Sequence, residues 1–329
     1  MLHPWTNYLI FVCETFTLVI ALLMVFLGLS AIRAKNKVIP GTLHIVKLND
    51  RLKATKAQLQ AAVLDKKTRN QLKKQEKQVK KALDVTKRIF IINFTGDLHA
   101  TQVSQLREEI TALLQIATEA DEVIVKLESP GGVVQAYGLA ASQLARIKAK
   151  NIRLTVCIDK IAASGGYLMA CVADAIIAAP FAIVGSIGVV AQLPNFHRLL
   201  KKHDIDFEQV TAGKYKRTLT LFGENTESSR EKMQEDLEEI HLAFKNHIST
   251  YRQGLNFDAV ATGEFWLASD ALKLNLVDQL QTSDDYIMQA SNAFDVFEIS
   301  FAAKKNLLQK IQTNMSLLLA QFSRVAESI

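Results

Sequence analysis

The sequence predicts a mainly parallel α/β domain that follows one N-terminal transmembrane helix. After residue 88, short apolar runs alternate with amphipathic segments, which is the pattern of strand–helix–strand units in a parallel sheet. Residues 8–32 form a nearly uncharged apolar stretch that is long enough to cross a bilayer as a helix. Hydrophobic residues make up 49% of the 329 and charged residues 22%, so the composition excludes a wholly disordered chain.

The apolar stretch 8–32 carries a single charge, Glu14, near its start. A cleaved signal peptide is the alternative, but it needs a basic segment ahead of an apolar run of about 7–15 residues. No Lys or Arg precedes this longer stretch, so we interpret residues 1–35 as a retained anchor. Glu14 is close enough to the membrane interface to snorkel, which we prefer to a role in proton transfer.

Residues 36–88 follow as a basic tether. Between Arg51 and Arg88 there are thirteen Lys or Arg residues, three acids, and no Gly or Pro. Helix-forming residues dominate without a heptad repeat, so we predict a solvated helix or a flexible linker. Attraction to anionic lipid is the functional alternative. A nucleic-acid partner is not expected, because no aromatic residue lies between the lysines.

Strands and helices alternate along residues 89–300, the predicted globular domain. The strands are short apolar or β-branched runs, which is typical of strands buried in a parallel sheet. They are expected at residues 89–94, 122–127, 153–158, 174–179 and 187–191. The helices carry apolar residues at intervals of three and four. They are expected at residues 102–116, 133–149 and 227–251, with a further helix that begins near Ser164.

Residues 301–329 are the last predicted segment, an amphipathic C-terminal helix. Its apolar residues recur at helical spacing from Leu307 to Val325. Such a stripe is expected to pack on the globular domain or on a sister subunit, and lying on a membrane surface is the alternative.

A pair of glycines follows a predicted strand in the sequence ESPGG (128–132). Consecutive glycines let the backbone turn tightly and expose its N–H groups at the carboxyl end of a parallel strand. Fixed N–H donors of this kind can stabilise an oxyanion, so Gly131 and Gly132 are candidate site residues. A plain turn is the alternative reading of this motif.

Ser164 lies among small residues in the sequence AASGGY (162–167), just after a predicted strand. A serine on such a turn, followed by Gly165 and a helix, is accessible and lies near the positive end of the helix dipole. These features make Ser164 a candidate nucleophile, although a helix-capping serine has the same pattern. Ser186 belongs to the turn GSIGVV (185–190), whose small residues permit a substrate to approach closely.

No histidine has a setting that favours it as the base for Ser164. A lysine is the remaining choice, as in known serine–lysine pairs. Lys214 and Lys216 both lie in the sequence GKYKR, and in an extended segment they point to the same face, so spacing does not distinguish them. The histidines that lie on predicted surface or polar helices are His197, His203, His241 and His247.

Together the four motifs resemble the signal peptide peptidase A (protease IV) family, and most closely its SohB-type inner-membrane members. The resemblance covers roughly residues 85–300 and includes the segment GEFWLASDALKLNLVD (263–278). Within that segment Asn275 stands where glycine is more usual. The resemblance implies a ClpP/crotonase-like fold, with Ser164 as the nucleophile and Lys216 as the general base.

By the same resemblance, Gly131 and Gly132 match the glycines beside the oxyanion. We add Gly165 and Ser186 to this predicted set of oxyanion and substrate-binding residues. No metal and no cofactor are expected.

The predicted function is that of a membrane-anchored serine endopeptidase. The resemblance implies cleavage of unfolded hydrophobic peptides, including signal peptides left in the membrane. It also implies a homo-oligomer in which neighbouring subunits complete the active sites. Two other classes stay open: a crotonase-like enzyme that acts on acyl thioesters, and a non-catalytic membrane scaffold that binds misfolded chains.

A single-pass location in the bacterial inner membrane is expected. Arg33, Lys35 and Lys37 directly follow the span, and the positive-inside rule then puts the globular domain in the cytoplasm. Related peptidases put this domain on the outer side. We favour the periplasmic side, because a long domain can translocate regardless of charge.

Overall fold

The computed structural model describes residues 8, 10–19, 41–72 and 87–303. Leu43–Ala302 form one compact unit. In the predicted anchor, residues 10–19 are helical and exposed, and residues 20–32 lie outside the described ranges. Within those ranges, no helix combines the length and the apolar character that crossing a bilayer requires. The predicted C-terminal helix also lies outside them, from residue 304 onward.

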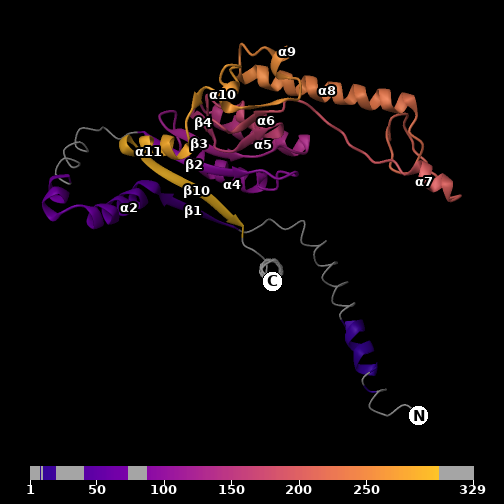
Figure 1. Cartoon of the computed structure of the whole chain (residues 1–329), viewed down its shortest axis with the longest axis horizontal. Coiled ribbons are helices and arrows are strands. Elements are labelled where there is room, and N and C mark those ends of the chain that lie inside the picture. The colour runs from indigo at the N-terminus through magenta and orange to yellow at the C-terminus, as the bar shows by residue number, and fades with distance from the viewer. Residues whose placement is uncertain (1–7, 9, 20–40, 73–86, 304–329) are drawn as a thin grey trace. The chain divides into compact units, whose positions relative to one another are not determined.

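A seven-stranded sheet forms the centre of the compact unit, in the order β1-β10-β2-β3-β4-β6-β9 (Figure 1). Every neighbouring pair from β10 to β9 is parallel. The mainly parallel α/β fold predicted from the sequence is therefore confirmed. The strands are β1 (Gly41–Lys47), β2 (Arg88–Thr95), β3 (Glu122–Glu128), β4 (Arg153–Ile158), β6 (Ala175–Ala178), β9 (Gln279–Leu280) and β10 (Asp295–Ala303).

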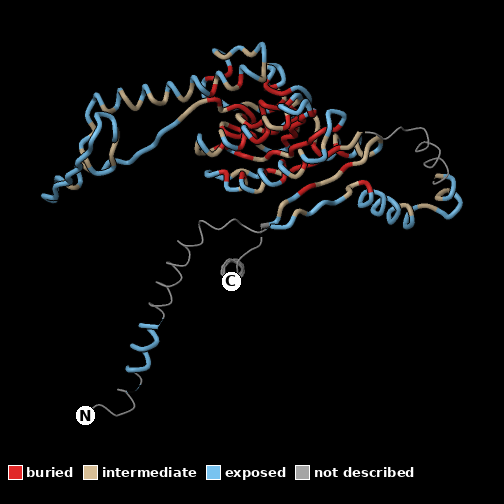
Figure 2. Tube along the Cα trace, turned by 180° about the vertical axis from the view of Figure 1, so that it is seen from behind, coloured by how far each residue is buried: buried red, intermediate tan, exposed pale blue. Residues whose placement is uncertain are grey.

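Helices cover both faces of this sheet, because successive residues of a strand point to opposite sides. On one face, Phe90, Ile92 and Phe94 of β2 belong to the core formed with α4 (Val103–Leu113) and α5 (Val134–Lys148). On the other face, the core includes Ile89, Ile91 and Ile287 of α11 (Ser283–Ala293). Figure 2 shows buried residues concentrated in the part of the compact unit that contains the sheet.

A smaller sheet of three strands lies beside the first: β5 (Ile161–Ala163), β7 (Ile183–Gly185) and β8 (Phe265–Leu267). β5 and β7 are parallel, and β7 and β8 are antiparallel. An isolated bridge pairs Ser129, just beyond β3, with Ala162 of β5. The small sheet thus brings the ESPGG segment next to the chain that leads into Ser164.

The strand predicted at residues 187–191 is wrong. The chain turns at Gly185 and Ser186, whose φ angles of 98° and 52° lie outside the β region. β7 therefore ends at Gly185, and residues 186–196 belong to no strand.

The helix predicted at residues 227–251 matches α8 (Glu227–Tyr251). The carboxyl-terminal part of α8 packs on the rest of the compact unit, and Phe244 and Ile248 are buried there. Residues 190–243, here called the arm, contain no buried residue and include the short helix α7 (His197–Lys202) (Figures 1 and 2). Further helices are α2 (Leu48–Val63), α6 (Gly165–Ala170), α9 (Phe257–Val260) and α10 (Ala268–Ala271), and residues 66–72 are also helical.

Candidate active site

Ser164 lies on the turn between β5 and α6. Its φ of 51° is one that residues other than glycine seldom adopt. The Ser164 N–H donates to the Gly185 carbonyl at 2.7 Å, and the Ser164 carbonyl accepts from the Leu168 N–H at 2.9 Å. The hydroxyl makes no capping hydrogen bond, so the side chain does not serve to begin α6. A strained backbone held by hydrogen bonds on both sides is typical of a functional residue.

The glycine pair of ESPGG lies directly against this turn. A Cβ atom added to Gly131 would lie 2.7 Å from the Ser164 Cβ and 2.7 Å from the Gly165 nitrogen. Gly131 also has a φ of 90°, which residues with a side chain disfavour. Both the close contact and the backbone conformation therefore require glycine at this position. A Cβ atom added to Gly132 would lie 2.2 Å from the Leu98 carbonyl oxygen. The structure therefore brings Gly131 and Gly165 into contact with Ser164, as the sequence motifs suggest.

The N–H groups of these glycines differ in their partners. The Gly131 N–H donates to Ser129 Oγ at 3.1 Å. In the described part of the chain, no acceptor takes the N–H of Gly132 or of Gly165. The first N–H groups of a helix have no partner within it, which accounts for Gly165. Gly132 and Gly165 are consequently the donors that could bind an oxyanion.

Ser186 lies beside the same turn. It follows Gly185, whose carbonyl accepts the Ser164 N–H, and its own N–H donates to the Glu264 carbonyl at 2.6 Å. Ser186 has a φ of 52°, so it is a second strained residue next to Ser164. Three loops, from ESPGG, AASGGY and GSIGVV, thus meet at one place.

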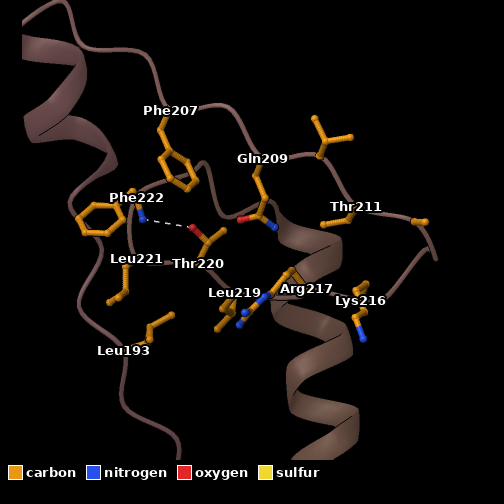
Figure 3. Close-up of a pocket in the computed structure, with 12 residues that line it drawn as sticks. Leu193, Phe207, Gln209, Thr211, Lys216, Arg217, Leu219, Thr220, Leu221 and Phe222 are labelled. Atoms are coloured by element: carbon orange, nitrogen blue, oxygen red, sulfur yellow. Dashed lines mark hydrogen bonds between the residues drawn. The ribbon is translucent and has the colours of Figure 1, made fainter. Parts of the chain in front are cut away.

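Lys216 lies elsewhere, in the arm, where it is exposed. It is one of 12 residues that line a hollow of about 680 Å³, all of them from residues 193–222 (Figure 3). The chain turns here: Gly213 has a φ of 100°, and the Lys216 N–H donates to the Gly213 carbonyl at 3.2 Å. The segment is not extended, so the argument that Lys214 and Lys216 share a face does not apply. Lys214 instead lies over the Tyr215 ring, 4.9 Å from its centroid.

Most of the length of α8 separates the Lys216 turn from Ser164. Tyr215 contacts the second turn of α8, where Lys232 Nζ lies 5.5 Å from the ring centroid. The other end of α8 contacts α6 through His247, whose Nε2 lies 3.2 Å from the Leu168 carbonyl oxygen. The fifteen residue steps of α8 from Lys232 to His247 span about 22 Å. In the described chain, the Lys216 turn and the Ser164 turn therefore lie near opposite ends of α8.

Among the described residues, no histidine forms a hydrogen bond with the Ser164 hydroxyl either. His197 lies in the arm, with Nδ1 3.3 Å from the Phe222 carbonyl oxygen. Burial lowers the pKa of His247, and the ring joins α8 to α6. Among the described residues, no hydrogen bond involves the Ser164 hydroxyl, so its activating base is not in contact with it within this part of the chain.

Two residues beneath the site were not singled out from the sequence. Ser129 and Tyr137 are both fully buried, and their hydroxyl oxygens lie 2.5 Å apart. Ser129 is part of ESPGG, but Tyr137 lies on α5 in a run that reads as ordinary amphipathic helix. Only the folded arrangement shows that they belong to the site. Within the described residues, no group of His, Cys, Asp and Glu could hold a metal ion.

Comparisons with known proteins agree with the motifs. The model described as "Peptidase family S49 N-terminal" matches residues 4–144, and "Peptidase family S49" matches residues 146–296. "Probable protease SohB" of Haemophilus influenzae is 45% identical over 93% of this chain and 91% of its own length. "Probable protease SohB" of Buchnera aphidicola subsp. Schlechtendalia chinensis is 45% identical over 86% of this chain and 98% of its own. The solved structure of a mutant of the "1510-N membrane-bound stomatin-specific protease" has a TM-score of 0.41 and 16% identity, covering 63% of this chain and 84% of that one.

Proposed function

The chain belongs to peptidase family S49 and is of the SohB type, and from this premise we propose that it is a membrane-anchored serine endopeptidase. Ser164 is the nucleophile and Lys216 the general base. The observation that carries the proposal is the close approach of Gly131 to the strained Ser164, next to two backbone N–H groups, those of Gly132 and Gly165, that have no acceptor in the described chain. A nucleophile beside unpaired donors is the arrangement that acyl transfer requires.

The reaction then proceeds through an acyl-enzyme. Ser164 Oγ attacks the scissile carbonyl carbon while Lys216 Nζ takes the hydroxyl proton. The negative charge that develops on the carbonyl oxygen is stabilised by the N–H groups of Gly132 and Gly165, each contributing about 3–4 kcal/mol. When the C–N bond breaks, Lys216 returns its proton to the leaving amine. Water, deprotonated by Lys216, attacks the ester carbonyl carbon, and when the C–Oγ bond breaks Lys216 returns that proton to Ser164 Oγ.

The lysine is proposed to come from a neighbouring subunit. A free lysine has a pKa near 10.4, and it becomes a base near neutral pH only when burial removes water from it. Lys216 is exposed and is separated from Ser164 by the length of α8. A second copy that covers the arm would both bury the lysine and bring it to a Ser164. Exposed apolar side chains support such a contact. They include Val190, Leu193, Phe196, Leu199, Phe207 and Val210.

The proposed substrates are unfolded hydrophobic peptides, including signal peptides left in the membrane. Anchoring by residues 8–32 supports this choice, because it raises the effective concentration of the active site near a membrane-bound substrate. We propose a single-pass location in the bacterial inner membrane, with the peptidase domain on the periplasmic side. Accessibility of the C-terminus to an added protease in spheroplasts tests the side: digestion supports it, and full protection reverses it.

The decisive experiment on the chemistry uses the full chain in detergent, with a fluorogenic apolar peptide and a fluorophosphonate probe. Ser164→Ala should abolish both cleavage and labelling, and Lys216→Ala should abolish cleavage. Lys214→Ala and His197→Ala are the matched controls and should keep most activity. Absence of labelling in the folded wild type, or normal turnover by Lys216→Ala, would refute the serine–lysine assignment.

A further inference from the structure

Beneath the glycine pair, a chain of hydroxyl groups runs through the protein interior. The Gly131 N–H donates to Ser129 Oγ at 3.1 Å. Ser129 Oγ lies 2.5 Å from Tyr137 Oη, and Tyr137 Oη donates to the Asp97 carbonyl oxygen at 2.8 Å. Ser129 and Tyr137 both have no exposed surface, so water does not compete for these bonds.

The direction of every bond in this chain follows from counting hydrogens. Tyr137 has one hydroxyl hydrogen, and it goes to the Asp97 carbonyl. Ser129 must therefore donate its hydrogen to Tyr137 Oη, which leaves the Ser129 oxygen to accept from Gly131. Hydrogen bonds that follow one another in a single direction polarise and strengthen each other. The peptide of Gly131 is thus held by a fully satisfied network.

The packing around the two side chains is equally specific. A Cβ atom added to Gly165 would lie 2.4 Å from Tyr137 Cγ. A Cβ atom added to Gly96 would lie 2.3 Å from both Ser129 Oγ and Tyr137 Oη, and one added to Gly166 would lie 2.6 Å from the Ser129 carbonyl oxygen. Glycines from two segments therefore enclose the pair. Tyr137 touches Gly165, which follows Ser164, and also bonds to the serine that holds Gly131.

We propose that Ser129 and Tyr137 are positioning residues that set the oxyanion donors against Ser164. The inference rests on the proposed function, because it concerns the same site. Neither side chain touches the substrate. Their hydroxyls fix the peptide of Gly131, which in turn aims the N–H of Gly132, while the Tyr137 ring supports Gly165 from below.

The consequence is a defect in the transition state rather than in substrate binding. Tyr137→Phe keeps the ring beneath Gly165 but removes the acceptor of the Ser129 hydrogen. The Ser129 hydroxyl must then turn toward another acceptor, and the Gly131 peptide loses its fixed partner. Because small displacements of preorganised donors are costly, kcat should fall about 10- to 100-fold while KM changes little. Ser129→Ala removes the same link from the other side and should give a similar loss.

Tyr167→Phe provides the matched control. Tyr167 is also fully buried, and its hydroxyl also donates to a backbone carbonyl, that of Leu276, at 2.9 Å. It has no bond to the glycine pair. Loss of this hydroxyl should lower the unfolding temperature as much as Tyr137→Phe does, with kcat within about threefold of wild type.

The experiment measures kcat, KM, the unfolding temperature and the affinity for a peptide aldehyde, whose tetrahedral adduct with Ser164 uses the oxyanion donors. In Tyr137→Phe and Ser129→Ala, aldehyde affinity should fall by the same factor as kcat, whereas affinity for the product peptide should not change. Equal kcat losses in Tyr137→Phe and Tyr167→Phe would overturn the inference. So would a loss in Tyr137→Phe that appears in KM alone. A wild type that neither cleaves peptide nor binds the aldehyde would instead refute the proposed function.

Discussion

Mixing two inactive variants should restore activity if the serine and lysine act between subunits. Ser164→Ala removes the nucleophile and keeps the lysine, and Lys216→Ala does the reverse. Within one chain, Tyr215 of the Lys216 turn contacts Lys232 near the start of α8, and His247 near the end of α8 contacts α6. About 22 Å of helix lies between these two contacts. Proton transfer needs a separation near 3 Å. An assembly of either variant alone lacks the nucleophile or the base at every site.

The size of the effect follows from how such chains mix. In a closed ring assembled at random from equal amounts, half of the subunits carry Ser164, and half of those have a neighbour that carries Lys216. About one quarter of the sites are then complete, so the mixture should show about a quarter of wild-type activity. If both residues had to come from one chain, the mixture would show none.

The assay requires that the two variants assemble together. They are co-expressed with different affinity tags and purified on both tags in turn, and cleavage of a fluorogenic apolar peptide is then measured. A Ser164→Ala chain paired with the double variant Ser164→Ala/Lys216→Ala is the control and should remain inactive. If an assembly that carries both tags cleaved the peptide no faster than this control, the idea that neighbouring subunits share the active site would be refuted.

Three further predictions concern residues outside the proposed chemistry. Burial raises the pKa of both Cys157 and Cys171 to about 12, so iodoacetamide at pH 8 should modify neither in the folded protein and both in urea, as measured by mass spectrometry. Burial also raises the pKa of Glu109, so ionisation of this carboxyl at neutral pH lowers the stability of the folded state. Glu109→Gln should therefore have a higher unfolding temperature than wild type at pH 7 and lose this advantage near pH 4. An equal gain at both pH values would contradict this cause. Asn275 has a φ of 58°, so Asn275→Gly should change stability by less than about 1 kcal/mol and Asn275→Val should cost more, as determined from urea unfolding.

The strands and helices that could be predicted are those with a strong local signal. The apolar runs at residues 89–94, 122–127 and 153–158 correspond to β2, β3 and β4, and the helix at 227–251 is α8. Strands of two or three residues, such as β5 and β9, are too short for any periodicity to appear. β10 was also missed, because its pairing with β2 joins Asp295 to Arg88 across the length of the domain.

The same distinction applies to the candidate site. Gly131 and Ser164 each follow a predicted strand, and loops at the carboxyl ends of neighbouring parallel strands meet at one edge. Their proximity was therefore predictable. That of Ser186 was not, because Ser186 was expected to precede a strand and instead follows β7. The position of Lys216 was not, because the arm is long, has no buried residue and carries no pattern that specifies where it docks. Tyr137 was missed for another reason: on a helix, a buried tyrosine reads as ordinary core.

Dividing the nucleophile and the base between chains would make activity depend on assembly. The Ser164 turn is built into the body, whereas Lys216 is exposed in the described chain. Removing water from the Lys216 amine costs free energy, and this must come from the free energy of association. Confinement to a membrane would favour association by raising the effective concentration of chains. Specific activity should therefore fall when the detergent-solubilised protein is diluted, in parallel with loss of the oligomer measured by sedimentation. Constant specific activity in a sample that sediments as a monomer would refute this dependence.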